Sequence, residues 1–248
     1  MKGEPSCPRC GNRVRAPGDP SAHLPVVPEA LLGPVPDTVP DDLASLPASA
    51  LPLGAESAVD LWHCELHGAV HPVQPVVAPD PFSLTEVARQ SQVPLWLPWP
   101  LPGRWRYGGV AYAGEKLDGA RATVVAASGP SLFAGECDLL LIAEEMGIGI
   151  GARFAGLPGP DPGPIFEDKV ADAKVYASGR PTPMWTVPDT GDRAVFVGEA
   201  RGMWLWLVLW PETAGALLYD DVVLTDLRDA LGEIPQLPVG TLSPRFFG

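Results

Sequence analysis

The chain has 248 residues, with 17 basic and 30 acidic side chains and a formal net charge of −13. This excess of negative charge argues against a broad phosphate-binding surface, and therefore against a general nucleic-acid-binding protein. The apolar fraction of 46% is ordinary for a globular protein and suffices for a sizeable core.

The first residues and the cysteine content indicate a cellular compartment. The chain opens with MKGEPSCPRCG, which lacks the apolar core of a secretory signal. The most apolar stretch, Met203 to Trp210, is far too short to cross a bilayer as a helix. Four cysteines that include one CxxC pair are typical of metal binding in a reducing compartment. We therefore expect a cytoplasmic protein that makes no membrane contact.

A basic cluster near the N-terminus runs against the overall charge. Lys2, Arg9, Arg13 and Arg15 are opposed only by Glu4. Such clusters are usually solvated rims, and this is the interpretation we favour. Nucleic-acid binding through these arginines remains a weaker hypothesis, and it predicts a steep dependence of binding on salt.

The same N-terminal segment contains the first candidate for chemistry. Cys7-Pro-Arg-Cys10 is a CxxC turn that presents two thiolates from one tight loop. Gly11 follows, and it can adopt the positive φ that such a turn requires. Residues 1–15, which include this turn, are therefore expected to supply two of the ligands of a metal site.

Residues 16–57 are rich in proline, alanine, leucine and aspartate. Prolines recur every few residues, a spacing that neither a helix nor a strand ladder tolerates. We expect a flexible insertion with one helical turn near DDLASL. Loop-closure entropy grows only slowly with length, so an insertion of this size is compatible with a metal site that spans it.

A second turn of the same form lies beyond the insertion. Cys64-Glu-Leu-His67 has the spacing of the first turn and is also followed by a glycine, Gly68. Zinc takes four ligands in a tetrahedron, and two matched turns supply four. The sequence therefore predicts a zinc site made of Cys7, Cys10, Cys64 and His67.

Alternatives for this site remain open at the level of the sequence. His63 and His71 are close enough to replace His67, although the matched spacing favours His67. Iron in a rubredoxin-like site is a lesser option, because a histidine ligand favours zinc. Glu65 belongs to no HExxH motif and no general base is evident, so we expect a structural and not a catalytic metal.

Residues 79–248 are expected to form the main domain, and residues 1–15 with 58–78 the zinc-ribbon-like module. Ser83 and Glu86 form a capping-box pattern that predicts a helix over residues 83–90. The Pro-Trp stretch at 93–105 predicts an irregular segment on the surface. A helix is also expected near residues 224–234. Strands are predicted, with turn signals between them, at residues 107–115, 120–128, 138–145, 173–178, 193–200, 202–210 and 216–224.

The order of the predicted elements indicates the fold class. Sequential strands with short connections favour an α+β domain with a mostly antiparallel sheet. At residues 203–210 apolar side chains alternate without a polar face, with Trp204, Trp206 and Trp210 on one side. A strand that is apolar on both faces is expected to be central and covered on both sides. A ligand pocket lined by these tryptophans is the alternative.

Residues 147–153 invite a nucleotide-binding interpretation. Gly147-Ile-Gly149-Ile-Gly151-Ala-Arg153 follows a predicted strand, but its third glycine falls one place early for the dinucleotide fingerprint. A flexible turn is the favoured interpretation. The functional alternative is an enzyme that acts on a small phosphorylated or acylated substrate through this turn, with Arg153 as the ligand.

Other patterns in the main domain give weaker signals. Glu199 and the aspartates from Asp220 to Asp229 can serve acid–base or cation chemistry, but they fit strand ends and a helix cap better. All histidines precede residue 72, so a Ser-His-Asp triad in the main domain is excluded unless its histidine comes from the zinc-ribbon-like module. Cys137 stands beside an apolar run and is expected in the core.

The two turns resemble those of the zinc-ribbon class over residues 1–15 and 61–73. Along the chain, the segments GEPSCPRCG, WHCELHGAVHPVQPV, VPLWLPWPLP, MWLWLVLWPE and LTDLRD resemble an uncharacterised family of actinobacterial proteins. The resemblance implies no established activity. The function expected from the sequence is a non-enzymatic, zinc-containing binding or accessory protein with an unidentified protein partner.

Overall fold

The computed structural model describes residues 4–18, 61–133, 135–166 and 170–247. The chain divides into two units, one of residues 14–70 and one of residues 1–13 with 71–248. Most of the predicted insertion, with its helical turn, lies outside the described residues. The module boundaries proposed from the sequence remain predictions.

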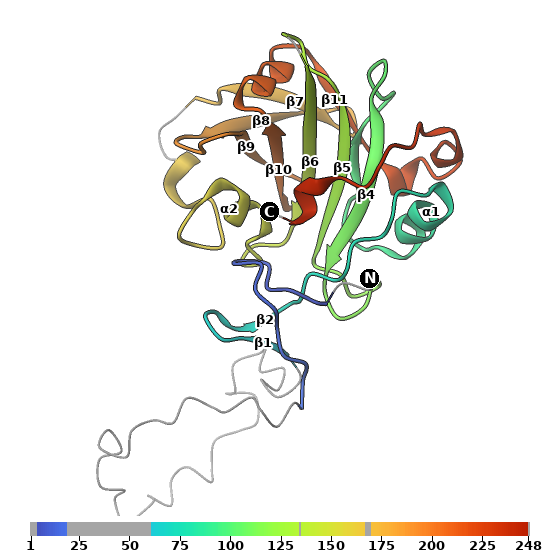
Figure 1. Cartoon of the computed structure of the whole chain (residues 1–248). Helices are drawn as coiled ribbons and strands as arrows, with labels where there is room; N and C mark the ends of the chain where they lie inside the picture. Colours follow the sequence, from blue (N-terminus) through green and yellow to red (C-terminus); the bar gives the residue numbers. More distant parts are fainter. Residues whose placement is uncertain (1–3, 19–60, 134, 167–169, 248) are drawn as a thin grey trace, which may run out of the picture. The chain divides into compact units, whose positions relative to one another are not determined.

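One curled sheet dominates the larger unit (Figure 1). Among the described residues it has nine strands in the order β3-β11-β7-β8-β9-β10-β6-β5-β4. Neighbouring strands are antiparallel except for the parallel pair β7 and β11. The predicted α+β class with a mostly antiparallel sheet is therefore confirmed. The strands are β3 (Trp96–Pro98), β4 (Arg106–Ala113), β5 (Ala122–Pro130), β6 (Glu136–Glu144), β7 (Ala173–Ala177), β8 (Arg180–Val187), β9 (Ala194–Ala200), β10 (Met203–Trp210) and β11 (Val222–Asp226).

The helices are few and short. The first helix is α1 (Pro81–Gln90). Asp80 is its N-cap, and the carboxylate of Asp80 accepts a hydrogen bond from Ser83 N. The predicted cap at Ser83 was wrong, because Pro81 is tolerated in the first turn and lets the helix start earlier. No helix in the described part of the chain is long and apolar enough to span a membrane. The other helices are α2 (Ile150–Ala155) and the 3-10 turns η4 (Gly163–Phe166), η5 (Glu212–Tyr219), η6 (Leu227–Asp229), η7 (Ile234–Gln236) and η8 (Pro244–Phe247).

The apolar strand β10 lies at the centre of the sheet, between β9 and β6. Its two sides enter two different clusters of buried side chains. Trp206 and Trp210 belong to one cluster, while Leu205 and Leu207 belong to the other. The predicted alternation and the burial of both faces are confirmed. Trp206 and Trp210 are buried core side chains, so they leave no room for the predicted alternative of an open tryptophan pocket.

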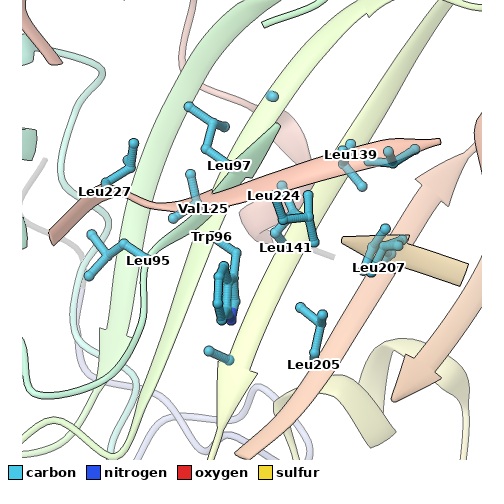
Figure 2. Packing of buried hydrophobic residues seen from close by; sticks show 14 of the residues in the cluster. Leu95, Trp96, Leu97, Val125, Leu139, Leu141, Leu205, Leu207, Leu224 and Leu227 are labelled. Carbon is cyan, nitrogen blue, oxygen red and sulfur yellow. The ribbon is translucent and has the colours of Figure 1, made fainter. Parts of the chain in front are cut away.

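The Pro-Trp stretch was predicted wrongly as a surface segment. Its middle forms the edge strand β3, which pairs with β11 at three positions. Leu95, Trp96 and Leu97 are fully buried, and Figure 2 shows them among leucines of β6, β10 and β11. Prolines are tolerated here because the strand is short and lies at the edge of the sheet, where fewer backbone N–H groups are needed.

Two further predictions near the C-terminal half need correction. Strand β8 was missed because it contains Pro181 and Pro183. Only Trp185–Val187 of β8 pair with β9. The two prolines lie in the first half of β8, which forms no backbone pairs with β9. The helix predicted near residues 224–234 is instead strand β11 followed by the short turns η6 and η7.

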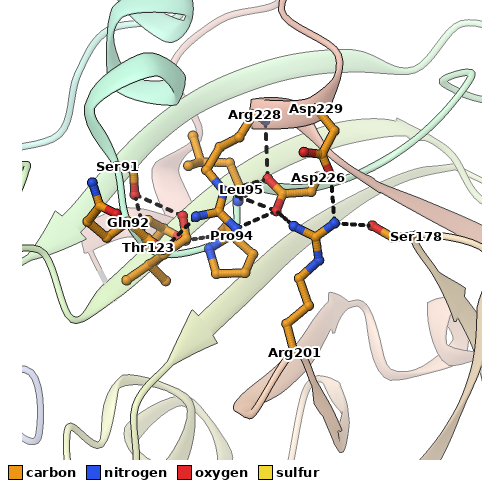
Figure 3. Close-up of polar contacts among 11 residues, drawn as sticks. Ser91, Gln92, Pro94, Leu95, Thr123, Ser178, Arg201, Asp226, Arg228 and Asp229 are labelled. Atoms are coloured by element: carbon orange, nitrogen blue, oxygen red, sulfur yellow. Dashed lines mark hydrogen bonds and ion pairs between the residues drawn. The ribbon is translucent and has the colours of Figure 1, made fainter.

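Asp226 is the fully buried member of the predicted acidic cluster (Figure 3). It ends β11 and caps η6 by accepting a hydrogen bond from Arg228 N. Oδ2 of Asp226 lies 2.7 Å from both Arg201 Nη1 and Arg228 Nη2. Oδ1 accepts a hydrogen bond from Leu95 N at 3.2 Å, which ties β3 to β11. A strand end and a helix cap are therefore confirmed for this residue.

We predict that Asp226→Ala destabilises the protein by about 2–4 kcal/mol, because it leaves the buried amide of Leu95 without its acceptor and removes the shared partner of Arg201 and Arg228. The matched control is Asp229→Ala, which removes only the exposed partner of Arg201. That change is expected to cost less than about 1 kcal/mol. Urea unfolding of the three proteins is the measurement, and equal losses in both variants would contradict the prediction.

Candidate metal centre

The second of the two turns is a hairpin in the smaller unit. Strand β1 (Trp62–Cys64) pairs with β2 (Gly68–Val70), with Cys64 opposite Gly68. Gly68 has a φ of 69°, the left-handed conformation for which the sequence provides a glycine. Within this turn Cys64 Sγ lies 3.6 Å from His67 Nδ1. The hairpin therefore directs both predicted ligands to one point.

The first turn belongs to the larger unit. Cys7 N donates to Asn12 O at 2.7 Å, and Gly11 N donates to Cys7 O at 2.8 Å. Gly11 has a φ of 76°, as the sequence predicted for this position. Ser6 pairs with both Arg13 and Val73, so the turn is held at its base by backbone bonds. These bonds fix the backbone of the turn that carries Cys7 and Cys10.

The four predicted ligands lie together. The ligand atoms of Cys7, Cys10, Cys64 and His67 are all within 4.8 Å of one another, a group that could hold a metal ion. Cys7 and Cys64 are buried, whereas Cys10 and His67 are partly exposed. His63, a predicted alternative ligand, is not in the group, and neither is His71.

Two arginines connect the first turn to residues 147–153 of the same unit. Arg9 Nη2 donates to Gly147 O at 2.8 Å. A Cβ at Gly11 would lie only 3.1 Å from Arg153 Nη1, so the glycine lets the guanidinium approach the turn. Burial lowers the pKa of Arg153, and the charges of Cys7 and Cys10 oppose that shift. Arg153 is therefore a neighbour of the cysteines, a role that the sequence reasoning missed because no local pattern joins residues so far apart.

Three amide groups within residues 147–151 already donate to carboxyl groups of the chain. Ile150 N and Gly151 N donate to Glu144 at 2.7 Å and 3.0 Å. Gly147 N donates to Asp161 Oδ1 at 2.8 Å, and the same oxygen accepts from Trp204 Nε1. A phosphate would need these donors. The geometry therefore disfavours the substrate site that the sequence offered as an alternative.

Glu144 has an unusual environment for a carboxylate. It is fully buried at the end of β6. Burial raises the pKa of Glu144 to about 7, although hydrogen bonds from Ile150, Gly151 and Gly149 act in the opposite direction. The nearby Asp161 adds a smaller upward shift. No sequence pattern indicated this group, because its burial arises only when α2 covers the end of the strand.

Cys137 lies in the core, as the sequence predicted. Its thiol is buried, and burial raises the pKa of Cys137 to about 11. A thiol with such a pKa is almost entirely protonated at neutral pH and is a poor nucleophile or metal ligand. Cys137 therefore has a structural role.

The carboxyl group of Glu144 predicts a pH dependence of stability. The pKa of Glu144 is about 7 in the folded chain, whereas its ordinary value, expected in the unfolded chain, is 4.5. Between pH 4.5 and pH 7 the folded chain therefore holds a proton that the unfolded chain has lost. This proton stabilises the folded state fully below the pKa of the unfolded chain. The stabilisation is lost as pH rises through the pKa of the folded chain, by at most about 1.4 kcal/mol per pH unit.

Glu144→Gln cannot titrate and is expected to remove this slope. Urea unfolding at several pH values across the interval is the measurement. Glu145→Gln, which changes the adjacent, 40% exposed carboxylate, is the matched control and should keep the slope. An unchanged slope in Glu144→Gln would show that the group is ionised throughout.

Comparison with known proteins identifies the family of the chain but no activity. No curated protein and no solved structure matches it. A family model, described as a family of unknown function (DUF6758), matches residues 52–246. The match includes Cys64, His67 and the whole sheet. Because it covers more than half of the sequence, the chain belongs to the DUF6758 family of unknown function.

Proposed function

We propose that the chain is a non-enzymatic binding or accessory protein of the cytoplasm in which Cys7, Cys10, Cys64 and His67 hold a structural zinc ion. The observation that supports this most directly is the approach of all four ligand atoms to within 4.8 Å of one another. Zinc would fix the two turns to each other, as disulfides do in oxidising compartments.

The distance between the ligand atoms of Cys64 and His67 fits zinc. Zinc–sulfur and zinc–nitrogen bonds of about 2.3 and 2.0–2.1 Å, at a tetrahedral angle, place sulfur and nitrogen about 3.6 Å apart. The distance between Cys64 Sγ and His67 Nδ1 is 3.6 Å. Four protein ligands complete the tetrahedron and leave no position for water, which supports a structural role. A histidine among the ligands favours zinc over iron.

Charge also supports the assignment. Three thiolates and one neutral imidazole around a divalent ion carry a net charge of −1, which needs a cation nearby when it is partly buried. Arg153 lies next to the cysteine turn and its charge interacts with Cys7 and Cys10. An arginine in this place would stabilise the thiolate form that zinc requires.

The enzyme hypothesis has weaker support. Its proposed phosphate-binding turn has amides already engaged by Glu144 and Asp161, and its proposed ligand, Arg153, lies beside the cysteines. The acidic residue Asp226 is neutralised by two arginines. Binding of a protein partner therefore remains the function that we favour.

Metal analysis tests the ligand set. The purified protein is expected to contain one zinc ion per chain, measured by native mass spectrometry. Cys64→Ala and His67→Ala should lose it, because each removes one ligand of a closed site. His63→Ala is the matched control and should keep the metal. Zinc-free wild-type protein after growth with added zinc, or loss in the His63 variant alone, would contradict the proposal.

The role of Arg153 has a separate test. Arg153→Gln is expected to weaken zinc binding by about 10–100-fold, the usual effect of removing a group that supports metal ligands. Competition with a chromogenic chelator gives the affinity. Arg13→Gln, which changes an arginine with a 75% exposed side chain paired to Glu4, is the control and should bind zinc as the wild type does. Equal affinities of the Arg153 variant and the wild type would exclude this role.

A further inference from the structure

A large groove lies in the main sheet unit, and no residue of the first cysteine turn lines it. Its volume is about 1020 Å³, and it is formed by the start of β7, the connection from β8 to β9, the start of β9, and the turn η5. Phe133, from the loop between β5 and β6, also lines it. None of the predicted site residues lines it.

The groove combines a buried apolar floor with exposed aromatic flanks. Val187, Phe196 and Leu218 line it and are themselves buried. Phe133 and Tyr219 also line it, but they are 70% and 87% exposed. Exposed aromatic side chains that meet at one depression from separate segments are characteristic of binding surfaces, where tyrosine and other aromatics provide much of the affinity.

The rim of the groove is acidic. Three carboxylates line it, those of Asp172, Asp189 and Glu212, against one cation, Arg193. Arg193 is already occupied, because it pairs with Asp192 at 2.8 Å and lies over the Trp210 ring at 5.1 Å. In the described chain, no lysine or arginine forms an ion pair with any of the three carboxylates. The rim therefore attracts positive charge.

We propose that this groove binds a segment of a partner protein in which large apolar side chains are flanked by lysine or arginine. This inference rests on the proposed binding function and names the chemistry of its partner. The apolar side chains of the segment would lie on the buried floor between Phe133 and Tyr219. Its cationic groups would meet Asp189 and Glu212. Complementary charge at the rim sets the choice of partner and the rate of association.

The open form of the groove favours a peptide segment over a small metabolite. Pockets for single small molecules have volumes of roughly 300–1000 Å³ and enclose most of the ligand. A groove of about 1020 Å³ with flanks as exposed as Tyr219 has room for several side chains but does not enclose them.

Peptide selection tests the proposal without knowledge of the natural partner. A random peptide library displayed on phage is selected against the full, metal-containing chain, and the affinity of an enriched peptide is measured by fluorescence anisotropy. Enriched sequences are expected to combine large apolar residues with lysine or arginine. Tyr219→Ala and Glu212→Lys should each raise Kd by about tenfold or more, the loss typical of a residue central to an interface.

Two variants outside the groove are matched controls. Phe82→Ala removes an aromatic side chain that is also 87% exposed, and Asp118→Lys makes the same charge change as Glu212→Lys at another exposed position. Both should bind the peptide with the wild-type Kd. The proposal is overturned by a selection that enriches nothing, by enriched peptides that are acidic, or by equal binding in the groove variants and the controls.

The same samples separate this inference from the zinc proposal. Metal content is measured for each variant, and the groove variants are expected to retain zinc. Peptide binding that depends on the groove supports this inference whether or not the chain holds a metal. If the chain holds zinc but binds no peptide, the proposal of a peptide-binding groove is wrong and the proposal of a zinc site is unaffected.

Discussion

A buried carboxylate at the end of β6 organises the part of the main unit on which the first cysteine turn rests. Glu144 accepts hydrogen bonds from Ile150 N and Gly151 N and so fixes the start of α2. A Cβ on Gly151 would lie 2.3 Å from the Trp206 ring, so α2 can reach this position only with a glycine there. The turn that results presents Gly147 O to Arg9 and brings Arg153 to Gly11.

This arrangement assigns a structural purpose to a glycine-rich turn that resembles a phosphate-binding loop. In such a loop the free amides bind an anion from outside. Here the acceptor is the chain's own Glu144 carboxyl group, and Asp161 accepts the amide hydrogen bond of Gly147. The positive charge nearby, Arg153, is directed at the cysteine turn. A glycine-rich turn therefore indicates an anion-binding site only when its backbone amides are not already hydrogen-bonded within the chain. The sequence alone does not reveal whether they are.

The sequence predicted those features that depend on local spacing. The two matched turns identified four residues that the fold brings within 4.8 Å, and the alternation along β10 identified its two buried faces. Local rules failed where position in the sheet decided the outcome. The prolines of β3 and β8 suggested loops, yet an edge strand and a partly paired strand tolerate them. Arg153 and Glu144 could not be assigned, because their neighbours come from distant segments.

X-ray absorption spectroscopy at the zinc edge on the purified protein tests the proposed metal site most directly. We expect three sulfur ligands at about 2.3 Å and one nitrogen ligand at about 2.0–2.1 Å. That result would establish the site of Cys7, Cys10, Cys64 and His67 as a closed zinc centre. Oxygen ligands, fewer than three sulfurs, or a sample without zinc would contradict it.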